Sequence, residues 1–62
     1  MKYYFVDTQV DVKKGSQTTV YMHQFTIGCS PHKLMDEIIK VIDNHDFDGK
    51  VEGYYIKNII LL

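Results

Sequence analysis

Cys29 and His32 stand two residues apart just before a segment with helical periodicity, a spacing that zinc sites use. A structural zinc site needs four ligands, and the remaining candidates, His23 and His45, do not form a second closely spaced pair. Across a symmetric dimer, Cys29 and His32 from two chains could complete such a site. Cys29 also precedes a helix N-terminus, where a thiol can become nucleophilic, but no base and orienting group accompany it. We therefore expect a buried cysteine at a helix cap and no metal ligand, cofactor or catalytic residue.

The segment from Asn44 to Glu52 resembles part of the calcium-binding loop of an EF-hand. Side chains with oxygen ligands occupy the first, third and fifth positions, and glycine occupies the sixth. The twelfth position, where an EF-hand has a bidentate glutamate, is Tyr55, and the residues that follow the glycine have strand patterning. We interpret the segment as a turn rich in aspartate and glycine, with calcium binding as the alternative.

Charge is uneven along the 62 residues, although the formal net charge is only −1. Residues 1–33 carry four lysines against two aspartates, and residues 34–62 carry three lysines against six carboxylates. The lack of a basic excess argues against nucleic acid and anionic membranes as partners. A solvated surface is the simpler interpretation of the acidic half, and docking of a partner protein is the functional one. The candidate docking residues are Asp36, Glu37, Asp43, Asp46, Asp48 and Glu52.

One helix is predicted, from Ser30 to His45, because apolar residues recur there at spacings of three and four. Ser30 is a favourable N-cap, and Pro31 fits the first helical position. The loop that follows, residues 44–50, contains Phe47, which we expect to cover one end of the core.

Three segments have strand patterning: residues 2–12, 18–28 and 51–62. In the first, the even-numbered residues make the better core face, which leaves Tyr3 and Phe5 on the other. Alternation in the second is irregular, which predicts either a bulge near His23 or partial cover of both faces. The third is apolar on both sides, as expected for a strand covered on both faces.

The order of these elements predicts one small α+β domain, ββαβ, over residues 1–62. Its sheet has three antiparallel strands in the order 2-1-3, with the helix packed on one face. The first two strands form a hairpin through a turn at residues 13–17, in which Gly15 supplies a positive φ. The alternative places the third strand beside the second as a parallel pair.

A single helix covers only one face of such a sheet, and a chain of this length is marginally stable unless something adds to its core. A contiguous apolar face usually marks an interface, and closed two-fold dimers are the commonest oligomers. We therefore predict a homodimer that packs through the second face of the sheet. The residues predicted for self-association are Tyr3, Phe5, Tyr21, Tyr55, Ile59 and Leu61.

Together these features predict a non-enzymatic protein-binding module. It would act as a homodimer and inhibit or regulate a larger partner protein, as small proteins of phages and mobile elements do. The alternative is a protein that binds single-stranded nucleic acid by stacking bases on the aromatic residues of the open sheet face. A single cysteine, no secretory segment and no apolar run of membrane-spanning length predict a cytoplasmic protein with no membrane partner.

Overall fold

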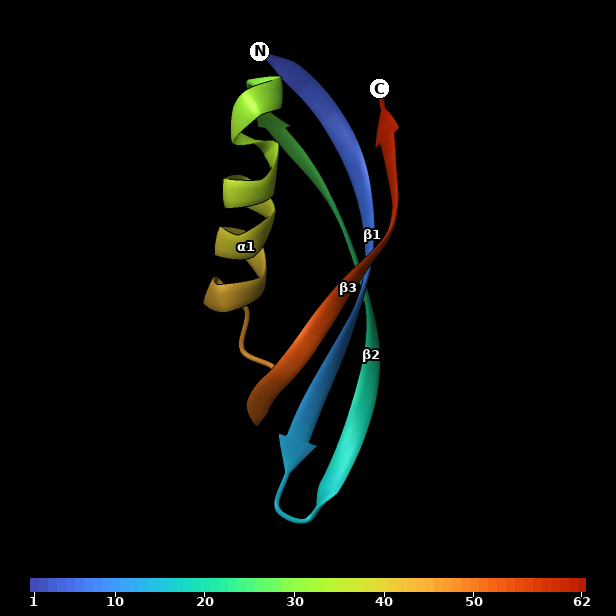
Figure 1. The fold of residues 1–62 in the computed structure, drawn as a ribbon, viewed down its shortest axis with the longest axis vertical. Coiled ribbons are helices and arrows are strands. Elements are labelled where there is room, and N and C mark those ends of the chain that lie inside the picture. Colours follow the sequence, from blue (N-terminus) through green and yellow to red (C-terminus); the bar gives the residue numbers. More distant parts are fainter.

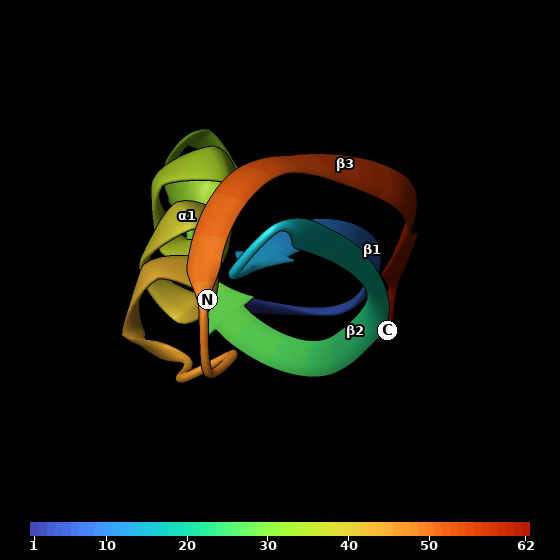
Figure 2. The same cartoon turned by 90° about the horizontal axis from the view of Figure 1, so that it is seen from below.

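A computed structural model describes all 62 residues, which fold into a three-stranded sheet and one main helix (Figure 1). The elements are β1 (Lys2–Lys14), β2 (Gln17–Cys29), a 3-10 turn (Pro31–Lys33), α1 (Leu34–Asn44) and β3 (Lys50–Leu61). The strands are antiparallel in the order β2-β1-β3, and α1 packs on one face of the sheet. This confirms the predicted α+β fold, its ββαβ topology and its strand order. The sheet curls so that its concave side faces α1 (Figure 2).

β1 and β2 form a long hairpin in which all thirteen residues of each strand are paired without a shift of register. Lys14 pairs with Gln17, so Gly15 and Ser16 alone make the connection, a shorter turn than predicted. Gly15 has a φ of 63°, which a residue without a side chain adopts readily. The predicted bulge near His23 is absent, and the odd-numbered residues of β2 therefore all share the α1 side of the sheet.

β3 pairs with β1 as well, but its register shifts twice. The extra residues are Glu52 and Lys57, which have no partner in the ladder. Each bulge reverses the alternation of side chains along the strand. Tyr55 and Ile59 were predicted to share one face, yet Tyr55 lies on the open side of the sheet and Ile59 on the α1 side. Simple alternation was wrong here because it takes no account of the bulges.

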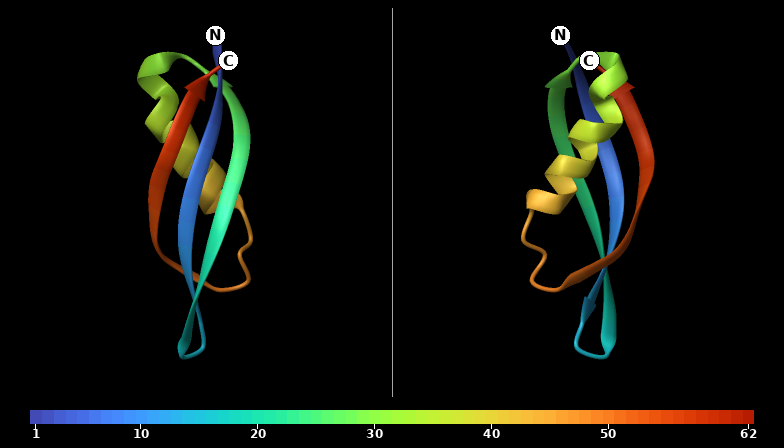
Figure 3. Two further views of the ribbon diagram at one scale, coloured as in Figure 1. Left: turned by 90° about the vertical axis from the view of Figure 1, so that its right-hand side faces the viewer. Right: turned by 60° about the vertical axis from the view of Figure 1, so that its left-hand side comes forward.

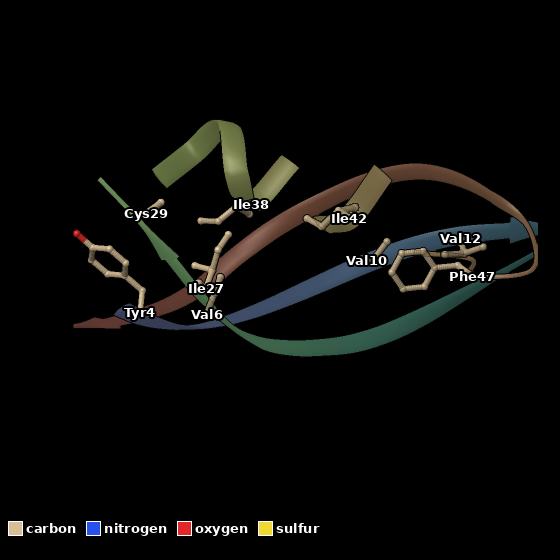
Figure 4. Packing of buried hydrophobic residues seen from close by; sticks show 9 residues of the cluster. All are labelled: Tyr4, Val6, Val10, Val12, Ile27, Cys29, Ile38, Ile42 and Phe47. Carbon is tan, nitrogen blue, oxygen red and sulfur yellow. The ribbon is translucent and has the colours of Figure 1, made fainter. Parts of the chain in front are cut away.

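The hydrophobic core lies between the concave side of the sheet and α1 (Figure 4). Its buried members are Tyr4, Val6, Val10, Val12, Ile27, Cys29, Ile38, Ile42 and Phe47. Phe47 covers the end of the core near Val10 and Val12, as predicted, and Cys29 is a buried free thiol. The one buried polar side chain is Thr8, whose hydroxyl donates a hydrogen bond of 2.7 Å to the carbonyl of His23. That bond removes the penalty of an unpaired polar group in the core.

The helical segment begins differently from the prediction, with a 3-10 turn before α1. The backbone N–H of Lys33 donates to the carbonyl of Ser30 over 3.0 Å, while the Ser30 side chain makes no capping hydrogen bond. α1 ends at Asn44, and the N–H of His45 donates to the carbonyl of Ile42 over 3.3 Å. None of the helical segments combines the length and the apolar character needed to cross a membrane.

The loop between α1 and β3 is held by its own side chains and by β1. The backbone N–H of Asp48 donates to Oδ1 of Asp46 over 2.8 Å, and Asp48 has a φ of 58°. Gly49 passes so close to β1 that a Cβ at this position would lie 2.7 Å from both the carbonyl oxygen of Lys13 and Cγ1 of Val12. Close backbone approach, and not a positive φ, therefore explains the glycine at this position.

Candidate functional site

The face of the sheet opposite α1 has no covering layer (Figure 3). This face is formed by the odd-numbered residues of β1, the central strand, which are flanked by even-numbered residues of β2 and by residues of β3. We call this surface the open face. Its apolar side chains are Tyr3, Phe5, Val20, Met22, Tyr55 and Ile60, of which all but the partly buried Phe5 are exposed.

Carboxylates and amides interrupt the apolar side chains of the open face. Asp7 lies between Gln24 of β2 and Asn58 of β3, and its Oδ1 accepts a hydrogen bond of 3.3 Å from Gln24. Two residues further along β1, Gln9 donates to Oδ1 of Asp11 over 3.2 Å. The prediction of an apolar second face is therefore wrong for the middle of the sheet, where two negative charges lie among exposed aromatic and aliphatic side chains.

Only half of the residues predicted for self-association lie on the open face. Tyr3, Phe5 and Tyr55 lie there, and the ring of Tyr3 lies over Gly28, where it would meet an added Cβ at 2.7 Å. The tyrosine ring thereby fills the space that the glycine of the neighbouring strand leaves empty because it has no side chain.

The other half belongs to the α1 side of the sheet. Tyr21, Ile59 and Leu61 are in register with the core residues Val10, Val6 and Tyr4, respectively. Tyr21 and Ile59 are partly buried against the core. The unbroken register of β2 and the bulge at Lys57 are the physical reasons for this correction.

Sequence reasoning missed Val20, Met22 and Ile60 on the open face. A signal for the two β2 residues was present, because a two-residue turn at Gly15 fixes the register of the whole hairpin. Counting outward from the Lys14–Gln17 pair places Met22 opposite Gln9 on that face.

At the hairpin end, Lys14 packs on Tyr21. The Lys14 Nζ donates a hydrogen bond to the Tyr21 hydroxyl and lies 4.9 Å from the centre of its ring. This hydrogen bond raises the pKa of Lys14 against an opposing effect of burial, and the carboxylates of Asp48 and Asp46 add to the rise. Two of the predicted docking carboxylates therefore lie in the field of a lysine of the same chain.

The acidic docking residues are divided among three elements: α1, the loop after it, and the first bulge of β3. Glu37 forms an ion pair of 3.2 Å with Lys40, and Asp46 holds the backbone of Asp48. No three His, Cys, Asp or Glu side chains come together as a possible metal site, so the EF-hand-like segment does not gather its carboxylates around one point. Docking by the acidic residues stays a prediction.

A cluster of aromatic rings lies on the α1 side of β2. The ring centres of His23 and His45 are 4.5 Å apart, and Phe25 and Phe47 each lie 5.4 Å from His23. Burial lowers the pKa of His23, and the charge of a protonated His45 lowers it further. This cluster packs the loop after α1 against β2. The structure has no pocket beside it or elsewhere.

Comparison with known protein families, curated proteins and solved structures finds no match for this chain. Any functional conclusion therefore rests on the faces and edges of the fold itself.

Proposed function

We propose that this chain is a non-enzymatic protein-binding module that holds a partner protein against the open face of its sheet. One observation carries the proposal: an uncovered face with exposed aromatic and aliphatic side chains around two hydrogen-bonded carboxylates. Tyr55 and Met22 are 58% and 54% exposed and both lie opposite Gln9, so they form part of one exposed patch. Aromatic side chains and methionine are enriched in protein interfaces, where they anchor the partner.

The dimensions of the open face suit a protein partner. The molecule extends 41 × 17 × 14 Å, and the open face, seen in Figure 3 (left), is spanned by the longest and the shortest of these extents, which gives roughly 570 Å². Standard protein interfaces bury about 800 Å² per partner. A partner that covers this side would form an interface at the lower end of the usual size range, and a module bound there would inhibit or regulate by covering a surface of its partner.

The charge in the middle of the open face favours one partner chemistry, while Lys13 and Lys50 lie opposite each other at the hairpin end of the same face. Asp7 and Asp11 each accept a side-chain hydrogen bond at Oδ1, which leaves Oδ2 free to accept from a partner. An apolar protein surface that presents arginine or lysine fits both features, because a guanidinium pairs strongly with a carboxylate. Single-stranded nucleic acid fits less well, because its phosphates would be repelled by the same carboxylates.

Site-specific photocrosslinking tests the proposal in cells of the source organism. A photoreactive residue would replace either Tyr55 on the open face or Met35 on the outer side of α1, which is similarly exposed at 48%. We expect one discrete protein adduct from position 55 and none from position 35. Asp7→Lys should remove that adduct, and Asp43→Lys on α1 should leave it.

Three results would contradict the proposal. An adduct formed only from position 35 would place recognition on the helix. A nuclease-sensitive adduct would indicate nucleic acid as the partner. A protein adduct that Asp7→Lys leaves unchanged would show that the carboxylates take no part.

A further inference from the structure

The two edges of the sheet differ in their protection against pairing with another strand. Natural sheets block their edges with bulges, charged side chains or proline. β3 has two bulges, and charged residues, Glu52 and Lys57, occupy them. β2 has no bulge, no proline and no Asp, Glu, Lys or Arg in thirteen residues.

The outer edge of β2 is therefore suited to pairing. Alternate residues of an edge strand direct their N–H and C=O groups away from the neighbouring strand, where they can bind a further strand. Figure 3 shows β2 forming one border of the sheet and β3 the other. Only ten of the 62 residues are buried, so added burial along this border would stabilise a small core.

We propose that β2 pairs antiparallel with β2 of a second copy, across a two-fold axis at His23. The axis lies there because His23 is the midpoint of Gln17–Cys29, so every residue of the strand then has a partner. Two sheets of three strands become one sheet of six. Tyr21 lies opposite Phe25 of the second copy, and Met22 lies opposite its Gln24.

A second copy fits this edge better than an unrelated strand. Antiparallel self-pairing places each strand against its own sequence, so any charged residue would risk facing a like charge, and β2 has no Asp, Glu, Lys or Arg. His23 faces its own copy at the axis, and burial lowers its pKa, which favours the uncharged form. The cross-strand pairs of Tyr21 with Phe25 extend the aromatic cluster that already contains His23 and Phe47. Both helices lie on one side of the joined sheet, and both open faces lie on the other. The inference concerns an edge of the sheet and does not depend on recognition by the open face.

Solution mass by light scattering, with the chain at tens of micromolar, tests the pairing. We expect the wild type to have twice the 7.3 kDa mass of one chain. Met22→Lys with Gln24→Lys should halve the mass, because each new lysine faces another across the axis. The matched control places the same two lysines on the β3 edge, at Tyr55 and Asn58, which lie opposite the same β1 residues, Gln9 and Asp7. That variant should keep the mass of a dimer.

A charge exchange separates loss of pairing from loss of folding. Met22→Glu with Gln24→Glu should also be monomeric, and an equimolar mixture of the lysine and glutamate variants should recover the mass of a dimer. Hydrogen exchange on the wild type adds a measurement without substitutions: the outward amides of β2 should exchange at least tenfold more slowly than those of β3.

The proposal is wrong if the wild type has the mass of one chain, or if the lysines on β3 halve the mass while those on β2 do not. It is also wrong if the mixed variants stay monomeric, or if the outward amides of β2 and β3 exchange equally fast. None of these results bears on crosslinking from the open face, so the two proposals can fail separately.

Discussion

The two faces of β1 differ by one residue step along the strand. Even-numbered residues from Tyr4 to Val12 are buried under α1, whereas Asp7, Gln9 and Asp11 on the other face remain partly exposed. The buried face tolerates a single polar side chain, Thr8, and only with its hydrogen bond made. The open face carries two carboxylates that water reaches. Substitutions on the two faces should therefore separate stability from recognition.

The largest effect should come from the centre of the buried face. Ile38 is fully buried, and Ile38→Ala should lower the free energy of unfolding by about 2–5 kcal/mol. That loss is large for so small a domain, so the variant should be mostly unfolded. Urea denaturation followed by circular dichroism measures it. Met35→Ala on the exposed side of α1 is the control and should change stability by less than about 0.5 kcal/mol. Equal effects of the two substitutions would contradict the packing of α1.

A smaller effect should come from the contact between the loop and β1. Gly49→Ala places a Cβ 2.7 Å from the Lys13 carbonyl oxygen, so the backbone must shift, at a cost of about 1–3 kcal/mol. Gly53→Ala on β3 meets nothing within 4 Å and should be close to neutral. Denaturant midpoints of the two variants provide the comparison. A neutral Gly49→Ala would mean that the loop does not approach β1 so closely.

A further, smaller effect should follow from the ring cluster on the buried side of β2. Because the pKa of His23 is lowered by folding, the unfolded chain takes up a proton more readily than the folded one. This contribution to stability is complete above the ordinary value of 6.5 and is lost as the pH falls through the lowered pKa of the folded state. Denaturant midpoints at a series of pH values should show the decline. His45→Gln removes the imidazolium charge that helps to lower the pKa of His23, so the loss of stability at low pH should become shallower. If the variant loses stability as steeply as the wild type, the pH dependence belongs to other groups.

The smallest effect on stability should come from the open face. Asp7→Asn removes a charge from a partly exposed position and should change the free energy of unfolding by less than about 0.5 kcal/mol. If the proposed recognition is correct, the same substitution should reduce the crosslink from position 55. Asp43→Asn on α1 is the matched control and should change neither property. A large loss of stability in Asp7→Asn would mean that this carboxylate supports the fold itself.

Much of the fold could be predicted from the sequence because its strongest signals are local. The alternation of β1, the apolar periodicity of α1 and the position of Phe47 each depend on neighbouring residues. The order of the elements along the chain, ββαβ, together with the preference for right-handed crossovers, then predicted the order of the strands in the sheet. The start of the helix was predicted less well, because Pro31 leads a 3-10 turn and the Ser30 side chain does not cap it.

The candidate site was predicted only in part, because it depends on register. A bulge is a property of two paired strands, and nothing in the apolar run of β3 marks Lys57 as the extra residue. Tyr55, before this bulge, was therefore assigned correctly to the open face, whereas Ile59, after it, was not. The hydrogen bond between Gln24 and Asp7 joins residues seventeen positions apart and becomes visible only once the hairpin is paired.

The position of β1 at the centre of the sheet also determines how the chain can fold. β1 is the first strand in sequence, yet one side of it stays open until β3 arrives, since Tyr4 pairs with Leu61 and the N–H of Leu62 donates to the carbonyl of Tyr3 over 2.8 Å. A lone hairpin is marginally stable in water, so β1 and β2 gain little before the final strand is present. Contacts that span almost the whole chain slow the search for the native state. During synthesis, the hairpin should therefore stay loosely structured until β3 leaves the ribosome, and the domain should then form in one concerted step.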